Sequence, residues 1–436
     1  MAETIGGVTD PAGSATTGAS EATGDVTGAS EATGNATGAS EATGNATGAS
    51  EATGGATAPR VLWYINPTDG DVPWEPTERV QPTFDVIRHQ ARTLDRLGYY
   101  GALTTAREAI SLVADTERLR FLVPEYPGVK PPVLMAEEAQ VFDQYSGGRL
   151  IYNQVNGADP VLHRYGRFGS KQERYRVSSE YWSLVKRLYL DDAEPYDGEF
   201  FSYGPRYKPP IPGPRQPDGI QVWGTGASPE GIEHAADVLD VYLSFMSEPT
   251  ALAGLFDRVR AAAATRGRTL QFGVLASVIV RETDEEAWER FESQLARTRP
   301  ETVLATADRN LRSFGYPGLD ELRSDNPLVQ GRIDALRAGR IPGREVLEFA
   351  PNMAAGLTTW TAAEPPFDIA GKGTGTYFVG SAENVAAAMS SVAERAGVDI
   401  WILSGWPLAT EAEITAELLL PLLADQSSRV AAVRGR

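Results

Sequence analysis

The stretch GGRLIYNQVNGADP, residues 147–160, joins a buried strand to a run of amides. Its letters RLIY follow a Gly-Gly turn and are mostly apolar, which predicts a strand inside the protein. Side-chain amides then crowd into four residues, at Asn153, Gln154 and Asn156. Because an unpaired polar group in the interior costs roughly 1–3 kcal/mol, we expect these amides to have partners, either in the core or in a bound molecule.

Strand-like and helix-like segments alternate on both sides of this stretch, which is typical of a parallel sheet with right-handed crossovers. About eight such units over residues 60–436 predict a (β/α)8 TIM barrel with insertions. A doubly wound open sheet is the alternative, although no G-x-G-x-x-G follows the first strand. The expected strands are RVLWYIN (60–66), YGAL (100–103), LRFLVPEY (119–126), LIYNQV (150–155), GIQVWGTG (219–226), TLQFGVLASVIVRE (269–282), GTYFVGS (375–381) and DIWILSG (399–405).

Three segments depart from this alternation. Residues 1–59 repeat a ten-residue unit, TGASEATGNA and close variants, with almost nothing large to bury, and they predict a disordered acidic leader. Residues 192–219 are rich in Pro, Gly and Tyr and predict an excursion with a small hairpin. Residues 295–370 hold helical pieces and several arginines, expected on a solvated face, and predict an insertion that covers the barrel mouth as a lid.

Composition excludes several classes of protein. The net charge of −18 argues against a nucleic-acid partner. The chain has no cysteine, so disulfides, thiolate nucleophiles and Cys-based metal sites are excluded. Its three histidines, His89, His163 and His234, lie far apart in sequence, and we expect no metal. No apolar run approaches the roughly 20 residues of a membrane span, so we expect a cytoplasmic protein without a membrane partner.

A second stretch, VWGTGASPEG at residues 222–231, predicts an anion site. Gly224 and Gly226 keep the turn after a strand free of side chains, and Ser228 can cap a helix that begins with Pro229. Backbone N–H groups at such a helix start bind a phosphate without a basic side chain. The same pattern also fits an ordinary capped helix after a glycine turn.

Ten segments occur in a recognisable order along residues 60–425: LWYINPTDGD, LDRLGYYGAL, RLRFLV, GGRLIYNQVNGADP, QERYRVSSEYW, YDGEFF, FGVLASVIVRETDEEAW, APNMAAG, GTYFVGSAENVAAAM and DIWILSGWPLATEAE. This ordered set resembles the bacterial-luciferase-like flavin monooxygenases, and within them the alkanesulfonate monooxygenase branch. No single segment is specific, but the set is. The resemblance implies a TIM barrel that binds reduced FMN.

The resemblance also implies flavin contacts. Asn153 would hydrogen-bond the edge of the isoalloxazine ring, and Asn156 stands where the family commonly has threonine. Tyr175, in the ERY motif, would contact the phosphate together with the turn at 225–228. Ala227 replaces one serine of that turn, so the phosphate would depend more on backbone N–H groups and the second serine. The expected cofactor-binding residues are Asn153, Asn156, Tyr175, Gly226, Ala227 and Ser228.

The residues expected at the barrel mouth depart from the sulfonate branch. That branch has Arg and His where this chain has Leu275 and Ser277, and it has SGYPH where this chain has Trp406 within SGWPL. Asp69 replaces the histidine of the first turn, and Lys372 stands beside the place of a lid arginine. Because an oxyanion substrate needs fixed donors and most are missing, a simple alkanesulfonate is not the expected substrate.

Four residues remain as candidates for chemistry. Ser277 would hydrogen-bond the flavin or the substrate, and Trp406 would stack on a ring or form a wall. Asp69 would act as a base or pair with an amine, and Lys372 would hold an anion. Each has a structural alternative: a strand serine, a core tryptophan, a turn aspartate and a solvated lysine. Segment 102–117, which covers the flavin in the family, is shorter here than the family pattern.

The resemblance therefore implies an FMNH2- and O2-dependent monooxygenase that acts on a small organic substrate through a flavin 4a-(hydro)peroxide. Reduced FMN would come from a separate NAD(P)H:flavin reductase, and the family suggests a homodimer or homotetramer. Two alternatives stay open. The chain could be a deazaflavin-dependent oxidoreductase on the same fold, or a non-catalytic flavin-binding homologue.

Overall fold

The structure is a computed structural model that describes residues 59–156, 159–167, 169–192, 194–205, 213–304, 317–356 and 375–425. The predicted leader lies outside these residues, apart from its last position, and so does Lys372. The described part therefore covers the barrel and much of its insertions.

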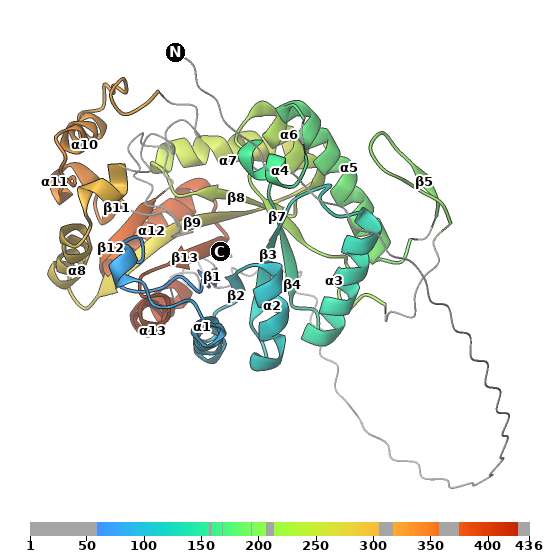
Figure 1. Ribbon diagram of the computed structural model, residues 1–436, viewed down its shortest axis with the longest axis horizontal. Helices are drawn as coiled ribbons and strands as arrows, with labels where there is room; N and C mark the ends of the chain where they lie inside the picture. The colour runs from blue at the N-terminus through green and yellow to red at the C-terminus, as the bar shows by residue number, and fades with distance from the viewer. Residues whose placement is uncertain are drawn as a thin grey trace, which may run out of the picture. The chain divides into compact units, whose positions relative to one another are not determined.

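Among the described residues, eight parallel strands close into a barrel in which β1 joins β2 on one side and β13 on the other. In Figure 1 these strands lie at the centre and helices surround them. The closed ring confirms the predicted (β/α)8 barrel and excludes the open sheet. The ring strands are β1 Arg60–Tyr64, β2 Gly101–Leu103, β3 Arg120–Glu125, β4 Leu150–Gln154, β7 Val222–Gly224, β8 Val241–Phe245, β9 Gln271–Arg281 and β13 Ile400–Ser404.

The ring differs from the sequence expectation at one strand. β8 is not among the predicted strands, because it follows α6 almost directly, with only Leu239 and Asp240 between them. The predicted strand at 375–381, observed as β12 (Thr376–Ser381), lies outside the ring. β9 is long enough to carry two neighbours on one edge: β8 pairs with Gln271–Leu275, and β12 pairs with Ser277–Arg281.

The helices that cover the barrel begin and end at recognisable signals. Gly98 ends α1 with a positive φ of 79°, Ser228 caps α6, and Thr283 forms a capping box with Glu286 at α8. The barrel helices are α1 Phe84–Leu97, α2 Ala106–Leu112, α3 Pro132–Ser146, α5 Lys171–Tyr189, α6 Pro229–Val238, α7 Pro249–Ala264, α8 Asp284–Ala296, α12 Ala382–Ala396 and α13 Leu408–Leu418, with the short α4 Asp159–Arg164 before α5.

The excursions are short elements attached to this barrel. Within 192–219, β5 (Tyr196–Asp197) and β6 (Ser202–Tyr203) form a small antiparallel hairpin that stands at the edge of the molecule in Figure 1. In the described part of 295–370, α10 (Pro327–Arg337) and α11 (Arg344–Leu347) precede an antiparallel extension of the sheet by β10 (Glu348–Ala350) and β11 (Met353–Ala355). Segment 102–117 forms α2 and the 3-10 turn Val113–Asp115.

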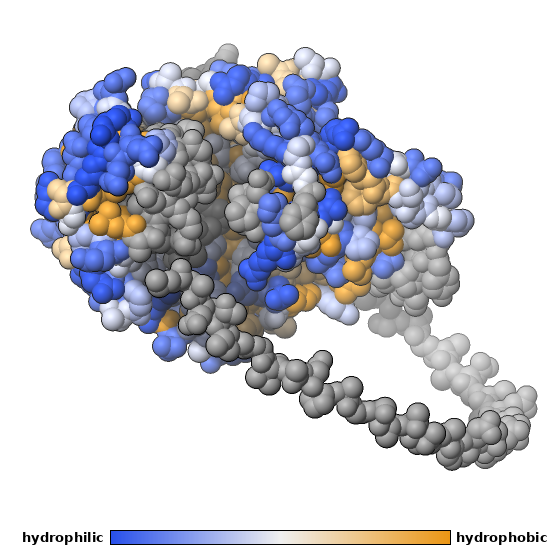
Figure 2. Space-filling view, turned by 45° about the horizontal axis from the view of Figure 1, so that its top comes forward, coloured by the Kyte–Doolittle hydropathy of each residue, from blue (hydrophilic) through white to orange (hydrophobic). Residues whose placement is uncertain are grey.

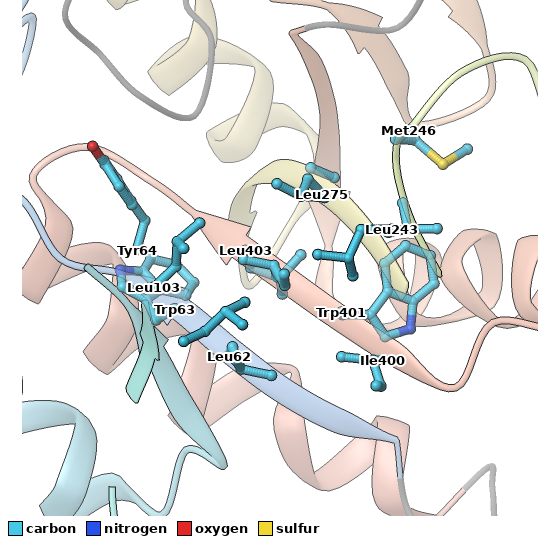
Figure 3. Packing of buried hydrophobic residues seen from close by; sticks show 14 of the residues in the cluster. Leu62, Trp63, Tyr64, Leu103, Leu243, Met246, Leu275, Ile400, Trp401 and Leu403 are labelled. Carbon is cyan, nitrogen blue, oxygen red and sulfur yellow. The ribbon is translucent and has the colours of Figure 1, made fainter. Parts of the chain in front are cut away.

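The strand registers show which side chains enter the barrel. Trp63 donates to the carbonyl of Leu408 at the start of α13, so it points outward, and its neighbour Tyr64 points inward. The same alternation turns Leu62, Leu103, Leu243 and Leu275 into the lumen, where they form part of one apolar core. Figure 3 shows these leucines close together, with the Tyr64 hydroxyl directed away from them. The middle of the lumen is therefore filled by apolar side chains, and polar groups lie toward its ends, with Arg60 bonded to Gln271 at the N-terminal end.

The outer surface is that of a polar protein. On the face shown in Figure 2, hydrophilic residues predominate and hydrophobic ones are scattered. Among the described residues, none of the helices has both the length and the apolar composition that a membrane-spanning helix needs.

Candidate flavin and substrate site at the barrel mouth

The turn between β7 and α6 has the construction of a phosphate cradle. Ser228 Oγ accepts from the Gly231 N–H at 3.2 Å, Pro229 has no N–H, and the Glu230 N–H bonds its own carboxyl, so the N–H groups that would meet a phosphate belong to the turn at 225–228. The backbone N–H of Glu230 holds the pKa of that residue's carboxyl below its usual range, so this helix start already favours negative charge. A phosphate would gain from the same field.

Glycine is required on both sides of this cradle. A Cβ at Gly226 would lie 2.9 Å from the Gly231 Cα, and a Cβ at Gly231 would lie 2.8 Å from the Gly226 Cα, C and O atoms. At Gly224, a Cβ would lie 2.7 Å from Gln154 Oε1. Close backbone approach of this kind keeps side chains out of the space beside the turn, while Ala227 and Thr225 are exposed.

Tyr175 completes the cradle from α5. Its hydroxyl would lie 3.2 Å from a Cβ built at Gly226, so it faces the turn directly. Burial raises the pKa of the Tyr175 hydroxyl, and a hydrogen bond with Ser228 acts in the opposite direction. The expected phosphate residues Tyr175, Gly226 and Ser228 are therefore brought together by the fold, and Ala227 lies beside them.

A buried histidine stands behind this cradle, and the sequence analysis assigned it no role. The His234 ring lies 5.5 Å from the Tyr175 ring and contacts the hydroxyls of Ser178 (3.2 Å to Nε2) and Ser179 (2.9 Å to Nδ1). Gln154 Oε1 lies 3.3 Å from Nε2. Burial lowers the pKa of His234 to about 4, so the ring is neutral at pH 7 and ties β4, α5 and α6 together.

The three amides of the opening stretch have separate environments. Asn153 and Gln154 belong to β4 itself rather than to the loop after it. Asn153 faces the lumen, since it is in register with Pro124 of β3 and Trp223 of β7, while Gln154 points outward to His234. Asn156 lines a small recess whose wall includes Arg167 and Arg174, and its buried Nδ2 has no hydrogen-bond partner.

A second group of side chains gathers at the C-terminal end of the lumen on the β9 side. Ser277 is 2% exposed and its Oγ lies 3.0 Å from Ser404 Oγ on β13. Tyr377 of β12 is in register with Ser277 and shares its face. Burial raises the pKa of the Tyr377 hydroxyl, and a hydrogen bond with Ser277 acts in the opposite direction. Among the described residues this hydroxyl has no other partner.

Trp406 and Tyr64 close this group on the β1 side. Their ring centroids lie 6.4 Å apart in an edge-to-face arrangement, and Trp406 is 1% exposed. The Trp406 indole N–H is buried and has no hydrogen-bond partner. The Tyr64 hydroxyl accepts from Asn66, and burial raises its pKa to about 12, so it stays protonated. We refer to Tyr64, Ser277, Tyr377, Ser404 and Trp406 as the mouth cluster.

Asp69 lies close to the mouth, but its acceptor capacity is used by the protein. Its Oδ1 accepts from the N–H groups of Leu408 (2.9 Å) and Gly70 (2.8 Å), and its Oδ2 accepts from Gln90 (2.8 Å). Burial raises the pKa of this carboxyl, and these hydrogen bonds oppose the increase. Asp69 therefore has a structural role, in which it joins the first loop to the start of α13.

The arginines expected on a solvated face are only partly so: Arg299, Arg323 and Arg340 are exposed, whereas Arg332 is buried. Arg297 bonds Asp71 at 2.9 Å, and Arg299 bonds Glu75 at 2.7 Å. Arg332 is 2% exposed and donates to a backbone carbonyl of the α11 region at 2.7 Å. Charge pairs therefore join the end of α8 to the first loop, and the buried Arg332 joins α10 to the α11 region by hydrogen bonds to carbonyls.

Sequence reasoning did not single out Tyr64, Tyr377, Ser404 or His234. Ser404 and Tyr64 could have been found by counting alternate positions toward the ends of their strands, because side chains of a strand alternate between lumen and helix layer. Tyr377 could not have been found in this way, because its position depends on the pairing of β12 with β9, which no local sequence pattern predicts. Within the described ranges, no group of three or more His, Cys, Asp or Glu side chains could hold a metal ion.

The chain matches the luciferase-like monooxygenase family over residues 67–399, which is well over half of its length. It belongs to this family. The match identifies the family as a whole and no particular branch of it.

Solved structures share the fold. A riboflavin lyase, solved with modified FMN and its substrate riboflavin, is 19% identical with a TM-score of 0.65, covering 85% of this chain and 92% of that one. A long-chain alkane monooxygenase is 18% identical with a TM-score of 0.64 and the same two coverages. An EDTA monooxygenase from Chelativorans sp. BNC1 is 16% identical with a TM-score of 0.61, covering 85% and 95%. At these identities the likeness establishes the fold.

Proposed function

We propose that the protein is an FMN-dependent monooxygenase that uses O2 to oxidise a small organic substrate at the C-terminal end of the barrel. The cradle formed by Gly226, Ser228, Gly231 and Tyr175 carries this proposal, because it offers backbone N–H groups, a hydroxyl and a side-chain-free approach to a phosphate. Family membership supports it. So do proteins with the same fold, which include a riboflavin lyase solved with modified FMN and two monooxygenases.

The residues present fit the rest of FMN. Asn153 faces the lumen at the end of β4, where its amide would meet the polar edge of the isoalloxazine ring. Asn156 has an unpaired buried Nδ2 between that strand and α5. When bound, reduced FMN supplies the chemistry of oxygen activation and transfer of one oxygen atom to the substrate. The cradle's contribution is to anchor the phosphate end.

The protein's own contribution at the mouth is to exclude water and hold the reactants. Ser277, Tyr377 and Trp406 are each 2% exposed or less, so water has little access to them. Ser277 would hydrogen-bond the flavin or the substrate, and Trp406 would form an aromatic wall. Asp69 would contribute indirectly, by holding the first loop in position against the start of α13. The sequence-based role of Lys372, an anion contact from the lid, remains a proposal because it lies outside the described residues.

We further propose that reduced FMN comes from a separate NAD(P)H:flavin reductase in the cytoplasm, and that the chain forms a homodimer or homotetramer. The absence of a nicotinamide fingerprint after the first strand supports the separate reductase. NADH added to the FMN-loaded protein should leave the flavin oxidised until a reductase is added. Reduction by NADH alone would contradict this part.

Flavin titrations test the cradle. Wild-type protein should bind FMN at least about tenfold more tightly than riboflavin, because only FMN brings the phosphate. Ser228→Ala and Tyr175→Phe should weaken FMN about fivefold to tenfold and leave riboflavin unchanged. Equal affinity for FMN and riboflavin in the wild type would refute the phosphate assignment. Binding of a deazaflavin cofactor in preference to FMN would favour the alternative oxidoreductase.

A further inference from the structure

The mouth cluster contains neutral hydrogen-bond donors that the protein itself does not use. The Trp406 indole N–H is buried and unpaired. The hydroxyls of Tyr377, Ser277 and Ser404 form a row, because Ser277 Oγ lies 3.0 Å from Ser404 Oγ and also contacts the Tyr377 hydroxyl. These two contacts use two of the three hydroxyl protons, so one proton is left for a further partner. Buried polar groups without partners are rare in proteins and are usually met by water or a ligand.

These donors lie at the same, C-terminal end of the barrel. Tyr377 and Ser404 flank Ser277 on the two edges of β9. Trp406 follows Ser404 by two residues and contacts the Tyr64 ring. The group thus combines an indole N–H and one free hydroxyl proton with two aromatic rings.

The charges next to this cluster balance one another. Glu411 and Arg290 are near enough to affect the Tyr377 hydroxyl, and they have opposite signs. Glu411 accepts from Arg281 at 2.7 and 2.9 Å, and Arg290 donates to Asp71 at 2.9 Å. Among the described residues around the cluster, Arg281 and Arg290 are engaged in pairs, while the carboxylates of Asp69 and of Glu108, which is near Tyr64, accept hydrogen bonds from neutral donors. A buried anionic substrate would therefore lose its hydration without gaining a cationic partner from these residues.

We infer that the mouth cluster binds an uncharged substrate with an exposed oxygen acceptor, of the carbonyl class, next to an aromatic or other flat apolar group. The acceptor oxygen takes hydrogen bonds from Trp406 Nε1 and from the one hydroxyl among Tyr377, Ser277 and Ser404 whose proton is free. The flat group lies against Trp406 and Tyr64. This inference rests on the proposed function, because it assigns the substrate of the same flavin site.

Three probes of one skeleton test the class: acetophenone as the neutral acceptor, ethylbenzene as the hydrocarbon and benzenesulfonate as the anion. Binding to FMN-loaded protein is followed by ligand-observed NMR and by perturbation of flavin absorbance. Acetophenone should bind at least about fivefold more tightly than either of the others. Tightest binding of benzenesulfonate would overturn the inference and favour an anion contact such as Lys372. Failure of all three to bind at millimolar concentration would also overturn it.

A matched pair of variants assigns the effect to the cluster. Trp406→Phe keeps an aromatic ring and removes the N–H, and it should weaken acetophenone about fivefold to tenfold while leaving ethylbenzene unchanged. Trp182→Phe is the control, because the Trp182 indole N–H is equally buried and unpaired but packs outside the barrel against Tyr152. It should change neither affinity. Unchanged acetophenone binding in Trp406→Phe would show that water satisfies this N–H and would refute the inference.

The failure of the inference can be told apart from the failure of the proposed function. FMN affinity is measured first on each protein, independently of any probe. Loss of FMN binding in wild-type protein would refute the proposed function. Normal FMN binding with the wrong probe order refutes only the substrate class.

Discussion

The substitution Gly231→Ala tests whether the cradle is built by backbone contact. The new methyl group would lie 2.8 Å from three backbone atoms of Gly226, closer than real Cβ atoms come to other heavy atoms. Backbone atoms cannot rotate away, so the turn or the helix start must move. Replacing glycine by alanine within a helix normally stabilises by up to about 1 kcal/mol, whereas overpacking costs about 1–3 kcal/mol. We expect a net loss of roughly 0–2 kcal/mol.

The loss of function should exceed the loss of stability. Movement of the Gly226 turn would misplace at least one N–H that faces the phosphate, and a hydrogen bond to a charged group contributes about 1.5–3 kcal/mol. FMN affinity should therefore fall by at least about tenfold. Urea denaturation and fluorescence titration with FMN measure the two effects on the same protein.

A helical glycine with open surroundings gives the control. Gly254 lies in α7, and a Cβ there would meet nothing within 4 Å. Gly254→Ala should stabilise the protein by about 0.5–1 kcal/mol and leave FMN affinity unchanged. If Gly231→Ala behaved like Gly254→Ala in both assays, the account of the cradle would be wrong.

Three further predictions concern the surrounding framework. The pKa of His234 is lowered from 6.5 to about 4 in the folded protein, so as the pH falls the unfolded chain takes up this proton first. The free energy of unfolding should therefore fall by about 3 kcal/mol between about pH 6.5 and pH 4. In urea melts at several pH values, His234→Gln should lose that part of the pH dependence. Asp69→Asn leaves one of the donors that bind Asp69, the Gln90 side chain of α1 or the Leu408 N–H of α13, without a good acceptor, and it should cost about 1–3 kcal/mol in denaturation while kcat per folded molecule stays within about twofold. A loss of kcat without loss of stability would instead support Asp69 as a base. Deleting residues 1–58, which lack groups large enough to form a core, should leave the melting temperature unchanged, and a lower one would show that the leader packs on the barrel.

The fold could be predicted because its signals are local. Each of these signals lies within a few consecutive residues: the strand segments, the Gly98 helix end, the Ser228 cap and the Thr283 capping box. The cradle at 222–231 was predictable for the same reason, because a glycine turn and a capped helix are consecutive in the chain.

The mouth could be predicted only in part, because it is assembled from distant segments. Ser277 and Ser404 are 127 residues apart in sequence, and only the barrel's register makes them neighbours. Tyr377 lies next to them because β9 extends beyond the end of β8 and pairs with β12 there. This pairing depends on tertiary structure rather than on local propensity. Likewise, Asp69 looks like a free carboxylate in sequence, but three donors from other segments occupy it in the fold.

The most direct test of the central claim is an anaerobic titration of the protein with reduced FMN, run beside the same titration with a reduced deazaflavin cofactor. The account predicts saturable binding of reduced FMN, at least about tenfold tighter than the deazaflavin, followed by oxygen consumption when oxygenated buffer and substrate are mixed in. Preferential binding of the deazaflavin, or no binding of reduced FMN, would contradict it.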